Sequence, residues 1–380
     1  MKRISILGAT GSIGRQTLDI VRQHPDKFKV AALVGQKNVA ALAAAALEFQ
    51  PDFVAIADGN AYPELKAALR GMQVEIAAGE GAAVEAARYD ADICMAAIVG
   101  IAGLPSTLAA IEQGKTVALA NKEALVCAGP LMINAAKKSG AKILPVDSEH
   151  NAIFQVLEQD NQKQVQKIIL TASGGPFRNW PQEKIQTATR AAALDHPNWS
   201  MGEKITIDSA TMMNKGLEFI EAHYLFDMPP DQIEILVHPQ SIIHSMVAYQ
   251  DGSILAQLGP PDMRVPIGYC LGYPRRLALN TASLDFTAIK NLSFEPPDDL
   301  RFPALGLARS ALAAGQIMPT ALNAANEVAV AAFLADKISF GRITEIIDGA
   351  MQRIENAPQN TIQELLAADL AARQIAEGLI

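Results

Sequence analysis

The stretch RISILGATGSIG, residues 3–14, decides the fold of this chain. Residues 3–7 have the pattern of a short apolar strand, which leads into a three-glycine turn and then an amphipathic helix over residues 12–22. Such a unit forms a dinucleotide cradle, because glycine lets the backbone approach the pyrophosphate and the first N–H groups of the helix face its charge. The spacing GxxGxxG is a variant of the usual fingerprint, and glycine turns join strands to helices in many α/β proteins. Its place at the first strand favours dinucleotide binding.

The second predicted strand, residues 28–34, indicates which dinucleotide is bound. It ends in Gly35, Gln36, Lys37 and Asn38, where an NAD site usually has an acid that accepts from the ribose 2′-hydroxyl. No acid stands here, and Lys37 offers positive charge beside the amide of Asn38. This favours a 2′-phosphate and hence NADP. The alternative is that Lys37 is a solvated residue before a helix.

The first 145 residues alternate short β-rich runs with Ala-rich helical stretches, which is typical of a doubly wound, Rossmann-like parallel sheet. Further strands are predicted at residues 53–57, 74–77, 93–97, 116–120 and 142–144.

The middle of the chain loses this alternation. SMVAYQDGSILAQL, residues 245–258, has a turn at Asp251 and Gly252 between two β-like runs, which predicts a hairpin. After a proline-rich link the pattern is helical, at about residues 304–314, 320–335, 343–355 and 362–377. We therefore expect a dinucleotide-binding domain (1–146), an α+β catalytic domain (147–284), a linker (285–299) and a C-terminal helical bundle (300–380).

Composition restricts the class of protein. The 380 residues are half apolar and carry a formal net charge of −8, so no basic nucleic-acid-binding surface is expected. The apolar run at residues 93–104 is too short to span a bilayer, and Gly8 interrupts any N-terminal signal segment. Cys94, Cys127 and Cys270 lack metal or redox spacing, which predicts buried free thiols and a reducing cytoplasm.

Two acidic segments predict a cation site. PVDSEHNAIFQ, residues 145–155, places Asp147 and Glu149 two apart after a predicted strand, so extended periodicity would send both carboxylates to one side. The alternative is a solvated acidic turn that caps the following helix. Downstream, Asn214 and Glu218 are four apart on one predicted helix face, beside Lys215. Together these segments could supply three carboxylates, an amide and a cation to one pocket.

Glycine-rich and aromatic segments predict a phosphate site and a lid. In TASGGPF, residues 171–177, Ser173 begins a turn whose N–H groups suit a phosphate, although an ordinary loop fits equally well. HPNWSMG, residues 196–202, has the make-up of a lid, with core packing of Trp199 as the alternative. ITIDSAT, residues 205–211, is interpreted as a β-like run ending near Ser209, which would supply the second half of the phosphate site with Asn214 and Lys215.

NKEAL, residues 121–125, follows the predicted strand at 116–120, at the end where ligands of a doubly wound sheet bind. Asn121, Lys122 and Glu123 are therefore expected near the nicotinamide, and Lys122 could neutralise a developing oxyanion. The alternative is a solvated lysine at a helix N-terminus. Among the histidines, His223 and His238 are interpreted as structural and His244 as site-lining at most.

These motifs together resemble the 1-deoxy-D-xylulose 5-phosphate reductoisomerase family. GATGSIG, ALANKEAL, PVDSEHNAIFQ, SGGPFR, HPNWSMG, DSATMMNKGLE, HPQSIIHSMV, PDMR and TALNAANE occur in the family's order over residues 8–327. The resemblance implies a homodimeric enzyme that uses NADPH and Mg²⁺ or Mn²⁺ to make 2-C-methyl-D-erythritol 4-phosphate for isoprenoid precursors. Gln36 and Ala172 stand where many relatives carry glycine, and either could alter a loop.

The resemblance also implies residue roles. The metal ligands would be Asp147, Glu149 and Glu218, with Lys122 also catalytic. Ser148, Lys122 and His196 would contact the sugar backbone, Ser173, Ser209, Asn214 and Lys215 the phosphate, and Trp199 and Met201 would belong to the flap. NADPH would be lined by Thr10, Gly11, Ser12, Ile13, Gly35, Gln36, Lys37, Asn38, Asn121, Glu123 and Gly202.

Two other functions are compatible with parts of the chain. A semialdehyde or homoserine dehydrogenase would share the two-domain NADP plan, but the former needs a nucleophilic cysteine, and Cys127 and Cys270 lack a setting for one. A non-catalytic NADP sensor would have no use for three carboxylates and a phosphate pocket.

Overall fold

The computed structural model describes residues 1–199 and 201–380, and the chain divides into two compact units. The first unit comprises residues 1–124, 130–151 and 262–281, and the second comprises residues 125–129, 152–261 and 282–380. Among the helices of the described residues, none combines the length and apolar character that a membrane span requires.

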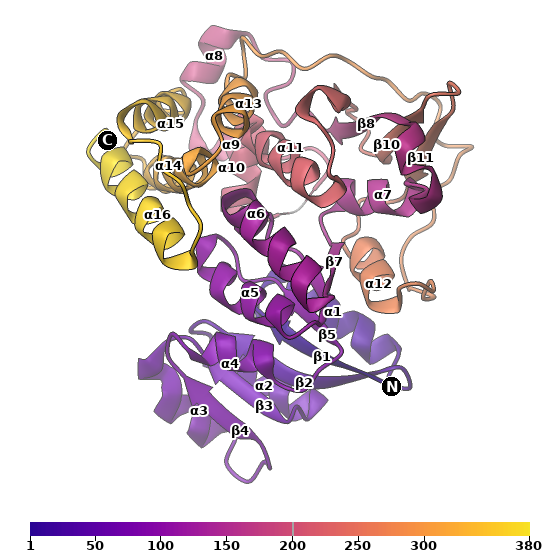
Figure 1. Ribbon diagram of the computed structural model, residues 1–380, viewed down its shortest axis with the longest axis vertical. Helices are drawn as coiled ribbons and strands as arrows, with labels where there is room; N and C mark the ends of the chain where they lie inside the picture. Colours follow the sequence, from indigo (N-terminus) through magenta and orange to yellow (C-terminus); the bar gives the residue numbers. More distant parts are fainter. Residues whose placement is uncertain (200) are drawn as a thin grey trace. The chain divides into compact units, whose positions relative to one another are not determined.

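The first unit is built on a parallel sheet, as predicted. Its strands lie in the order β4-β3-β2-β1-β5-β6-β7 (Figure 1). The chain adds β2, β3 and β4 on one side of β1 and then returns to add β5, β6 and β7 on the other side, so the strand order reverses between the neighbours β1 and β5. This reversal is where doubly wound sheets bind ligands, at the carboxyl ends of the strands. The strands are β1 (Lys2–Leu7), β2 (Phe28–Gly35), β3 (Phe53–Ile56), β4 (Glu75–Ala78), β5 (Ile93–Ala96), β6 (Thr116–Leu119) and β7 (Lys142–Pro145).

Helices connect these strands. Right-handed crossovers place α1 and α2 on one face of the sheet and α4 and α5 on the other, and α4 packs against α5. The connecting helices are α1 (Ser12–Gln23), α2 (Val39–Phe49), α3 (Tyr62–Ala68), α4 (Ala82–Arg88), α5 (Leu104–Glu112) and α6 (Lys122–Ser139), with short 3-10 turns η1 (Gly59–Ala61) and η2 (Ile101–Gly103). Residues 125–129 of α6 belong to the second unit, and α12 (Arg264–Gly272) comes from the segment 262–281.

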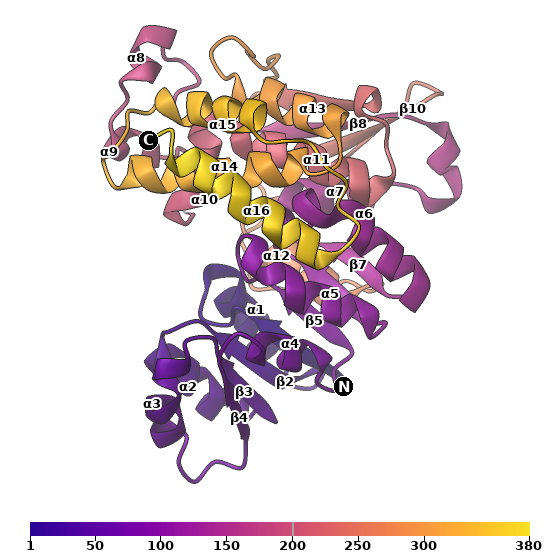
Figure 2. The ribbon, with the colours of Figure 1, turned by 60° about the vertical axis from the view of Figure 1, so that its left-hand side comes forward.

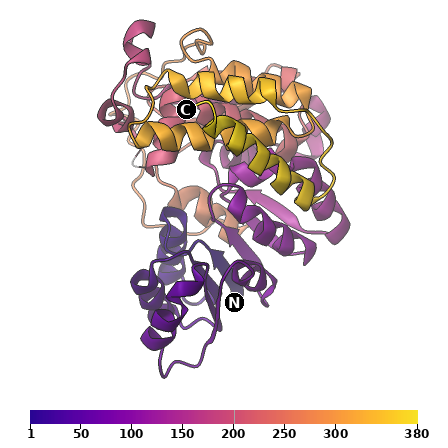
Figure 3. The same cartoon turned by 90° about the vertical axis from the view of Figure 1, so that its left-hand side faces the viewer.

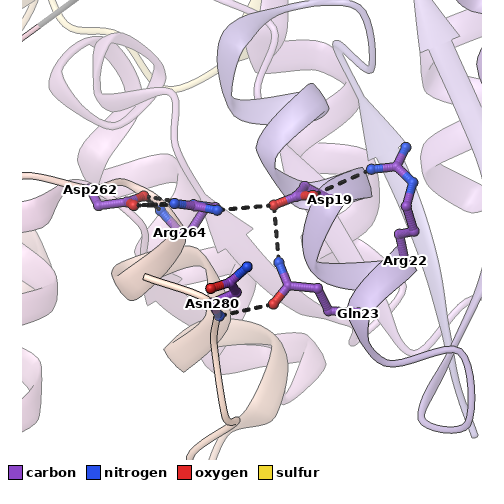
Figure 4. A network of polar contacts seen from close by, with 6 residues as sticks. All are labelled: Asp19, Arg22, Gln23, Asp262, Arg264 and Asn280. Atoms are coloured by element: carbon purple, nitrogen blue, oxygen red, sulfur yellow. Dashed lines mark hydrogen bonds and ion pairs between the residues drawn. The ribbon is translucent and has the colours of Figure 1, made fainter. Parts of the chain in front are cut away.

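A polar network ties the segment 262–281 to helix α1 (Figure 4). The Arg264 guanidinium bonds the Asp262 carboxylate at 2.6 Å and reaches Asp19 of α1 at 3.4 Å. Further along, the Asn280 N–H donates to the Gln23 side chain at 3.0 Å. A late segment of the chain thereby supports the helix that starts at the glycine turn.

The second unit contains a mixed sheet in the order β11-β10-β8-β9. Strands β10 and β11 pair antiparallel, which confirms the predicted hairpin, whereas β8 and β9 are parallel and end side by side. The apolar core of the unit includes Leu170, Phe177 and Val247. The strands are β8 (Val165–Ala172), β9 (Ile233–Val237), β10 (Ile243–Tyr249) and β11 (Ile254–Leu258).

Helices make up the rest of the second unit. Near its C-terminal end, α14, α15 and α16 pack against one another, as the orange and yellow ribbons show (Figures 2 and 3). The predicted C-terminal helices are confirmed to within two residues at each end. The helices are α8 (Gln182–Gln186), α9 (Arg190–Leu194), α10 (Glu203–Thr211), α11 (Met213–Phe226), α13 (Ala304–Ala314), α14 (Met318–Leu334), α15 (Arg342–Arg353) and α16 (Ile362–Glu377), with η3 (Gln159–Gln164) and η4 (Pro230–Gln232); α7 (Ser148–Val156) begins in the first unit.

The structure corrects two local predictions. Residues 205–211 are not a β-like run but part of helix α10, because Gly202 and the left-handed Met212 bound a helix whose buried side chains pack against α11 and α14. Burial here outweighs the strand preference of Ile205, Thr206 and Ile207. The extended spacing expected for Asp147 and Glu149 is also wrong, because α7 begins at Ser148.

The predicted functional domains do not coincide with the compact units. Residues 262–281 pack with the first unit, and residues 300–380 pack in the second unit together with its sheet. Division into units describes packing and does not test which part binds which ligand, so the functional division stays a prediction.

Candidate active site

The glycine turn after β1 has the geometry of a dinucleotide cradle. Gly8 has φ +88°, and a Cβ there would lie 2.5 Å from the Ala97 carbonyl oxygen. A Cβ on Gly14 would lie 2.3 Å from the Gly8 oxygen, so these two glycines are needed for close backbone packing. Gly11 and Ser12 are exposed, and the first turn of α1 carries no acidic side chain. The N–H groups of that turn therefore suit an anion.

The end of β2 lies beside this turn, because the Gly8 and Ala9 N–H groups donate to the Val34 carbonyl at 3.0 and 2.7 Å. Gln36, Lys37 and Asn38 are exposed there. The Asn38 side-chain oxygen caps α2 by accepting from the Ala41 N–H at 3.0 Å. The structure thus places the predicted 2′-phosphate residues next to the cradle.

Asn121 connects two loops at the carboxyl edge of the same sheet. Its side-chain oxygen caps α6 by accepting from the Ala124 N–H at 3.2 Å, and its amide donates to the Gly100 carbonyl at 2.9 Å. Asn121 is buried. Gly103 leaves room for its side chain, since a Cβ on Gly103 would lie 2.4 Å from the Asn121 amide nitrogen. Asn121 therefore shapes the loop after β5, a role that the sequence did not reveal.

Lys122 forms a buried ion pair with Asp147. The two residues follow the neighbouring strands β6 and β7, and their side chains are only 6% and 14% exposed. The alternative of a solvated Lys122 is therefore wrong. Beside the pair, the Ser148 hydroxyl donates to the Glu149 carboxylate at 2.6 Å. One edge of the first unit thus holds two carboxylates, a hydroxyl and an ammonium group.

In the second unit, the loop after β8 packs against the last turn of α10. Gly174 and Gly175 have φ of +82° and +68°, and a Cβ on Gly175 would lie 2.5 Å from the Ser209 carbonyl oxygen. Only glycine permits this approach. The loop that starts at Ser173 and the turn that carries Ser209 are therefore neighbours, as the predicted phosphate site requires.

His196 is oriented by three hydrogen bonds. Its Nδ1 accepts from the backbone N–H groups of Asn198 and Trp199 at 3.2 and 3.0 Å, so the proton of the neutral ring resides on Nε2. Nε2 then donates to the Ser173 hydroxyl oxygen at 3.0 Å, and that oxygen also accepts from the Gly175 N–H. Burial lowers the pKa of His196, which favours this neutral form.

The predicted flap is anchored on the segment that follows β9. The Asn198 amide donates to the Pro239 carbonyl at 2.6 Å and to the Ser241 hydroxyl at 3.0 Å, and the Trp199 ring lies 6.1 Å from the His244 ring. The contact between the Trp199 and His244 rings places His244 beside the predicted flap. Within this flap, Met201 is half-buried and Gly202 is the exposed N-cap of α10, while Ser200 lies outside the described residues.

Helix α11 brings three predicted residues together. Both the Asn214 amide and the Lys215 ammonium group donate to the Glu218 carboxylate, across the one-turn spacing that the sequence indicated. Glu218 is fully buried and Lys215 nearly so. A buried carboxylate needs partners of this kind to offset its loss of hydration, and a bound cation could take the place of the Lys215 ammonium group.

Three family models match successive parts of the chain. They describe 1-deoxy-D-xylulose 5-phosphate reductoisomerase (residues 4–129), its C-terminal domain (143–226) and the DXP reductoisomerase C-terminal domain (258–375). A curated 1-deoxy-D-xylulose 5-phosphate reductoisomerase from Rhodopseudomonas palustris (strain TIE-1) is 53% identical over 100% of this chain and 94% of its own length. The chain belongs to the 1-deoxy-D-xylulose 5-phosphate reductoisomerase family.

Solved structures of this family have the same fold. The reductoisomerase from Zymomonas mobilis in complex with NADPH is 51% identical, with a TM-score of 0.95 over 100% of this chain and 98% of its own. A second reductoisomerase, in complex with NADPH, fosmidomycin and magnesium, is 44% identical with the same TM-score and the same coverage. The predicted family and fold class are confirmed.

Sequence reasoning missed several residues that shape this reductoisomerase site. Asn198 holds the segment of the predicted flap through contacts with Pro239 and Ser241, which lie about forty residues away along the chain. The pattern around Asn198 gives no sign of these partners, because a side chain to backbone bond across such a distance leaves no periodicity. The HPNWSMG motif drew attention to its aromatic and imidazole groups instead.

Proposed function

We propose that this protein rearranges and reduces 1-deoxy-D-xylulose 5-phosphate to 2-C-methyl-D-erythritol 4-phosphate, a step in isoprenoid precursor synthesis. It is an NADP-dependent oxidoreductase of the reductoisomerase family that works with a divalent cation. The observation that carries the proposal is the carboxyl edge of the first unit's sheet. That edge holds both the dinucleotide cradle and the Lys122–Asp147 pair, so one sheet would position the proposed hydride donor and the proposed oxyanion-stabilising group.

NADPH fits the cradle by chemistry. The glycine turn and α1 offer N–H groups to the pyrophosphate, and exposed Lys37 offers charge to the 2′-phosphate. When bound, NADPH supplies the hydride that reduces the rearranged carbonyl. The residues proposed to line it are Thr10, Gly11, Ser12, Ile13, Gly35, Gln36, Lys37, Asn38, Asn121, Glu123 and Gly202.

The proposed metal ligands are Asp147, Glu149 and Glu218. All three present carboxylate oxygens, the donors that Mg²⁺ and Mn²⁺ favour, and each is at most partly exposed. When bound, the cation polarises the carbonyl and adjacent hydroxyl of the substrate. The pairing of Asp147 with Lys122, and of Glu218 with Lys215, orients these carboxylates for that task.

The remaining site residues orient the substrate. Lys122 donates to the oxyanion that develops as the carbonyl is reduced, while Ser148 and His196 contact the sugar backbone. The phosphate is proposed to lie at Ser173, Ser209, Asn214 and Lys215. Support comes from the close packing of the Ser173 loop on Ser209 and from the ammonium group of Lys215 on the adjoining helix.

Trp199 and Met201 belong to a flap that excludes water from the reaction. Within the functional division proposed here, residues 1–146 bind NADPH, and residues 147–284 supply the metal ligands, the phosphate site, the flap and the dimer contacts. Residues 285–299 link this part to the helical residues 300–380. The anchoring of Asn198 on Pro239 and Ser241 supports the flap assignment, because it restrains one end of the segment.

We further propose a homodimer in the cytoplasm. Strand β11 is an edge strand of the second unit's sheet and exposes Ile254 and Leu255, at 56% and 38%, which suits pairing with a second copy. The three cysteines are buried and none of them forms a disulfide, as in proteins of reducing compartments. Sedimentation equilibrium should give twice the chain mass of 40.5 kDa; a monomer at micromolar concentration would contradict the dimer.

The function is tested by following NADPH oxidation with 1-deoxy-D-xylulose 5-phosphate, with and without Mg²⁺. We expect turnover only when substrate and cation are both present, and 2-C-methyl-D-erythritol 4-phosphate as the product. Oxidation of NADPH by a semialdehyde or homoserine-type substrate, with no response to the sugar phosphate, would identify the protein as another dehydrogenase. Binding of NADPH without turnover of any of these compounds would indicate a sensor.

Replacement of Lys37 by glutamate tests the choice of dinucleotide. We expect the KM for NADPH to rise at least about tenfold, with less change in the KM for NADH, because repulsion replaces an ion pair to the 2′-phosphate. Lys66, a lysine on α3 whose ammonium group lies over the Tyr62 ring, provides the matched control when it is changed to glutamate. An unchanged ratio of the two KM values in the Lys37 variant would show that another group binds the 2′-phosphate.

A further inference from the structure

A buried carboxylate lies immediately before Ser209 and is held by a distant helix. Asp208 is 1% exposed, and its Oδ1 accepts from the Asn326 amide at 2.8 Å. Its Oδ2 forms an ion pair with Lys204, one turn earlier on α10, also at 2.8 Å. Asn326 lies in the interior of α14 and is fully buried. The two residues are 118 positions apart in the sequence.

The setting of α10 determines where the proposed phosphate residues lie. A single residue, Met212 with φ +64°, separates α10 from α11, so Ser209 and Asn214 flank one short junction. The Thr211 hydroxyl stabilises it by donating to the Asp208 carbonyl at 3.2 Å and accepting from the Met213 N–H at 3.2 Å. Rotation or displacement of α10 would therefore move Ser209 relative to the Ser173 loop that packs on it.

The negative charge of Asp208, next to Ser209 in the sequence, is unfavourable for binding of the proposed phosphate. An unoriented carboxylate there would repel the dianion across a poorly screened interior. Lys204 balances its charge, and the Asn326 amide fixes the direction in which the carboxylate points. A carboxylate held by an amide of a buried helix cannot turn without leaving that amide unsatisfied, which is unfavourable in the interior.

We infer that Asn326 is a positioning residue for the phosphate subsite, acting through Asp208 on Ser209. The C-terminal helix α14, which carries none of the proposed ligand-binding residues, thereby sets the affinity of the enzyme for its phosphorylated substrate. This inference rests on the proposed assignment of the phosphate to Ser173, Ser209, Asn214 and Lys215. It goes beyond that assignment by giving a role to a helix outside the site.

The test compares the same substitution at two buried asparagines of α14. Asn326→Asp places a second carboxylate against Asp208, so we expect the KM for 1-deoxy-D-xylulose 5-phosphate to rise about tenfold or more. The KM for NADPH should stay within twofold. Asn323→Asp is the matched control, since Asn323 is equally buried and its amide donates to the Glu327 carboxylate within α14 at 3.1 Å. Both variants should lose thermal stability, but only the first should lose substrate affinity.

A charge exchange provides the rescue. In the double variant Asp208→Asn with Asn326→Asp, one carboxylate and one amide again face each other, and the KM for the substrate should return most of the way to its original value. The inhibition constant of inorganic phosphate, measured against the substrate, should follow the same order across the variants. Equal KM changes in the Asn326 and Asn323 variants, or no rescue in the double variant, would overturn the inference.

Two further comparisons keep the outcome unambiguous. If Asn326→Asp fails to fold, Asn326→Leu and Asn323→Leu, which add no charge, carry the same comparison with the same expected difference. Ser209→Ala separates the inference from the proposed function. An unchanged substrate KM in Ser209→Ala would remove the phosphate assignment itself, whereas a raised KM there with no effect at Asn326 would remove only the role of α14.

Discussion

Replacement of Glu218 by glutamine should lower turnover of 1-deoxy-D-xylulose 5-phosphate by more than about 100-fold. This loss of activity is larger than the loss that follows mutation of a residue that only orients a metal ligand. Glutamine keeps the size of the side chain and the helix propensity of α11, but it removes one negative charge from the proposed oxygen set. The Mg²⁺ concentration for half-maximal activity should rise in parallel. Binding of NADPH, measured by fluorescence, should persist because the cradle lies in the first unit.

The control lies on the same helix. Glu221 is also fully buried on α11, one turn after Glu218, so Glu221→Gln removes a buried carboxylate at a neighbouring position. If Glu218 is the ligand, the Glu221 variant should keep its response to Mg²⁺ even if it loses thermal stability. A larger loss of Mg²⁺ affinity in the Glu221 variant would assign the third ligand to Glu221 instead.

The residues at the carboxyl edge of the first sheet could be predicted because parallel strands impose a rule. Short apolar runs separated by helical stretches define strand ends, and the polar residues that follow β1, β2, β6 and β7 must lie along one edge. Lys122 and Asp147 follow adjacent strands, so their contact is a consequence of strand order. Asn214, Lys215 and Glu218 were predictable for a similar reason, since helix periodicity places them on one face.

What the sequence did not reveal depends on packing between distant segments. The run ITIDSAT is rich in β-branched residues, yet contacts with α11 and α14 bury it as helix α10. Asn323 and Asn326 lie three residues apart on α14, and only the structure distinguishes the amide that reaches Asp208 from the one that stays within its own helix. Side chain pairs of this kind leave no periodic signal in one sequence.

The two roles proposed for Lys122, as partner of Asp147 and as donor to the oxyanion, can be separated. Lys122→Met should lower kcat by about 100- to 1,000-fold, as loss of an oxyanion donor does in a water-excluded site. Methionine keeps most of the length of lysine and its apolar character while it removes the charge and the donors. The same change leaves the buried Asp147 carboxylate without its ammonium partner, which lowers stability. Lys115→Met is the control for stability alone, because Lys115 is likewise buried in the first unit but donates to the Ala87 and Tyr89 carbonyls.

The comparison of these two lysines decides what the charge at Lys122 does. Both variants should unfold at lower temperature, but only Lys122→Met should lose kcat, and saturating Mg²⁺ should restore part of its stability, because a bound cation compensates Asp147. Lys122→Arg should recover only part of kcat, since the planar guanidinium keeps the charge but cannot occupy the position of a compact ammonium group. Should Lys122→Met retain its kcat while its melting temperature falls as in the Lys115 variant, Lys122 would serve only to hold Asp147, and the developing oxyanion would need another donor.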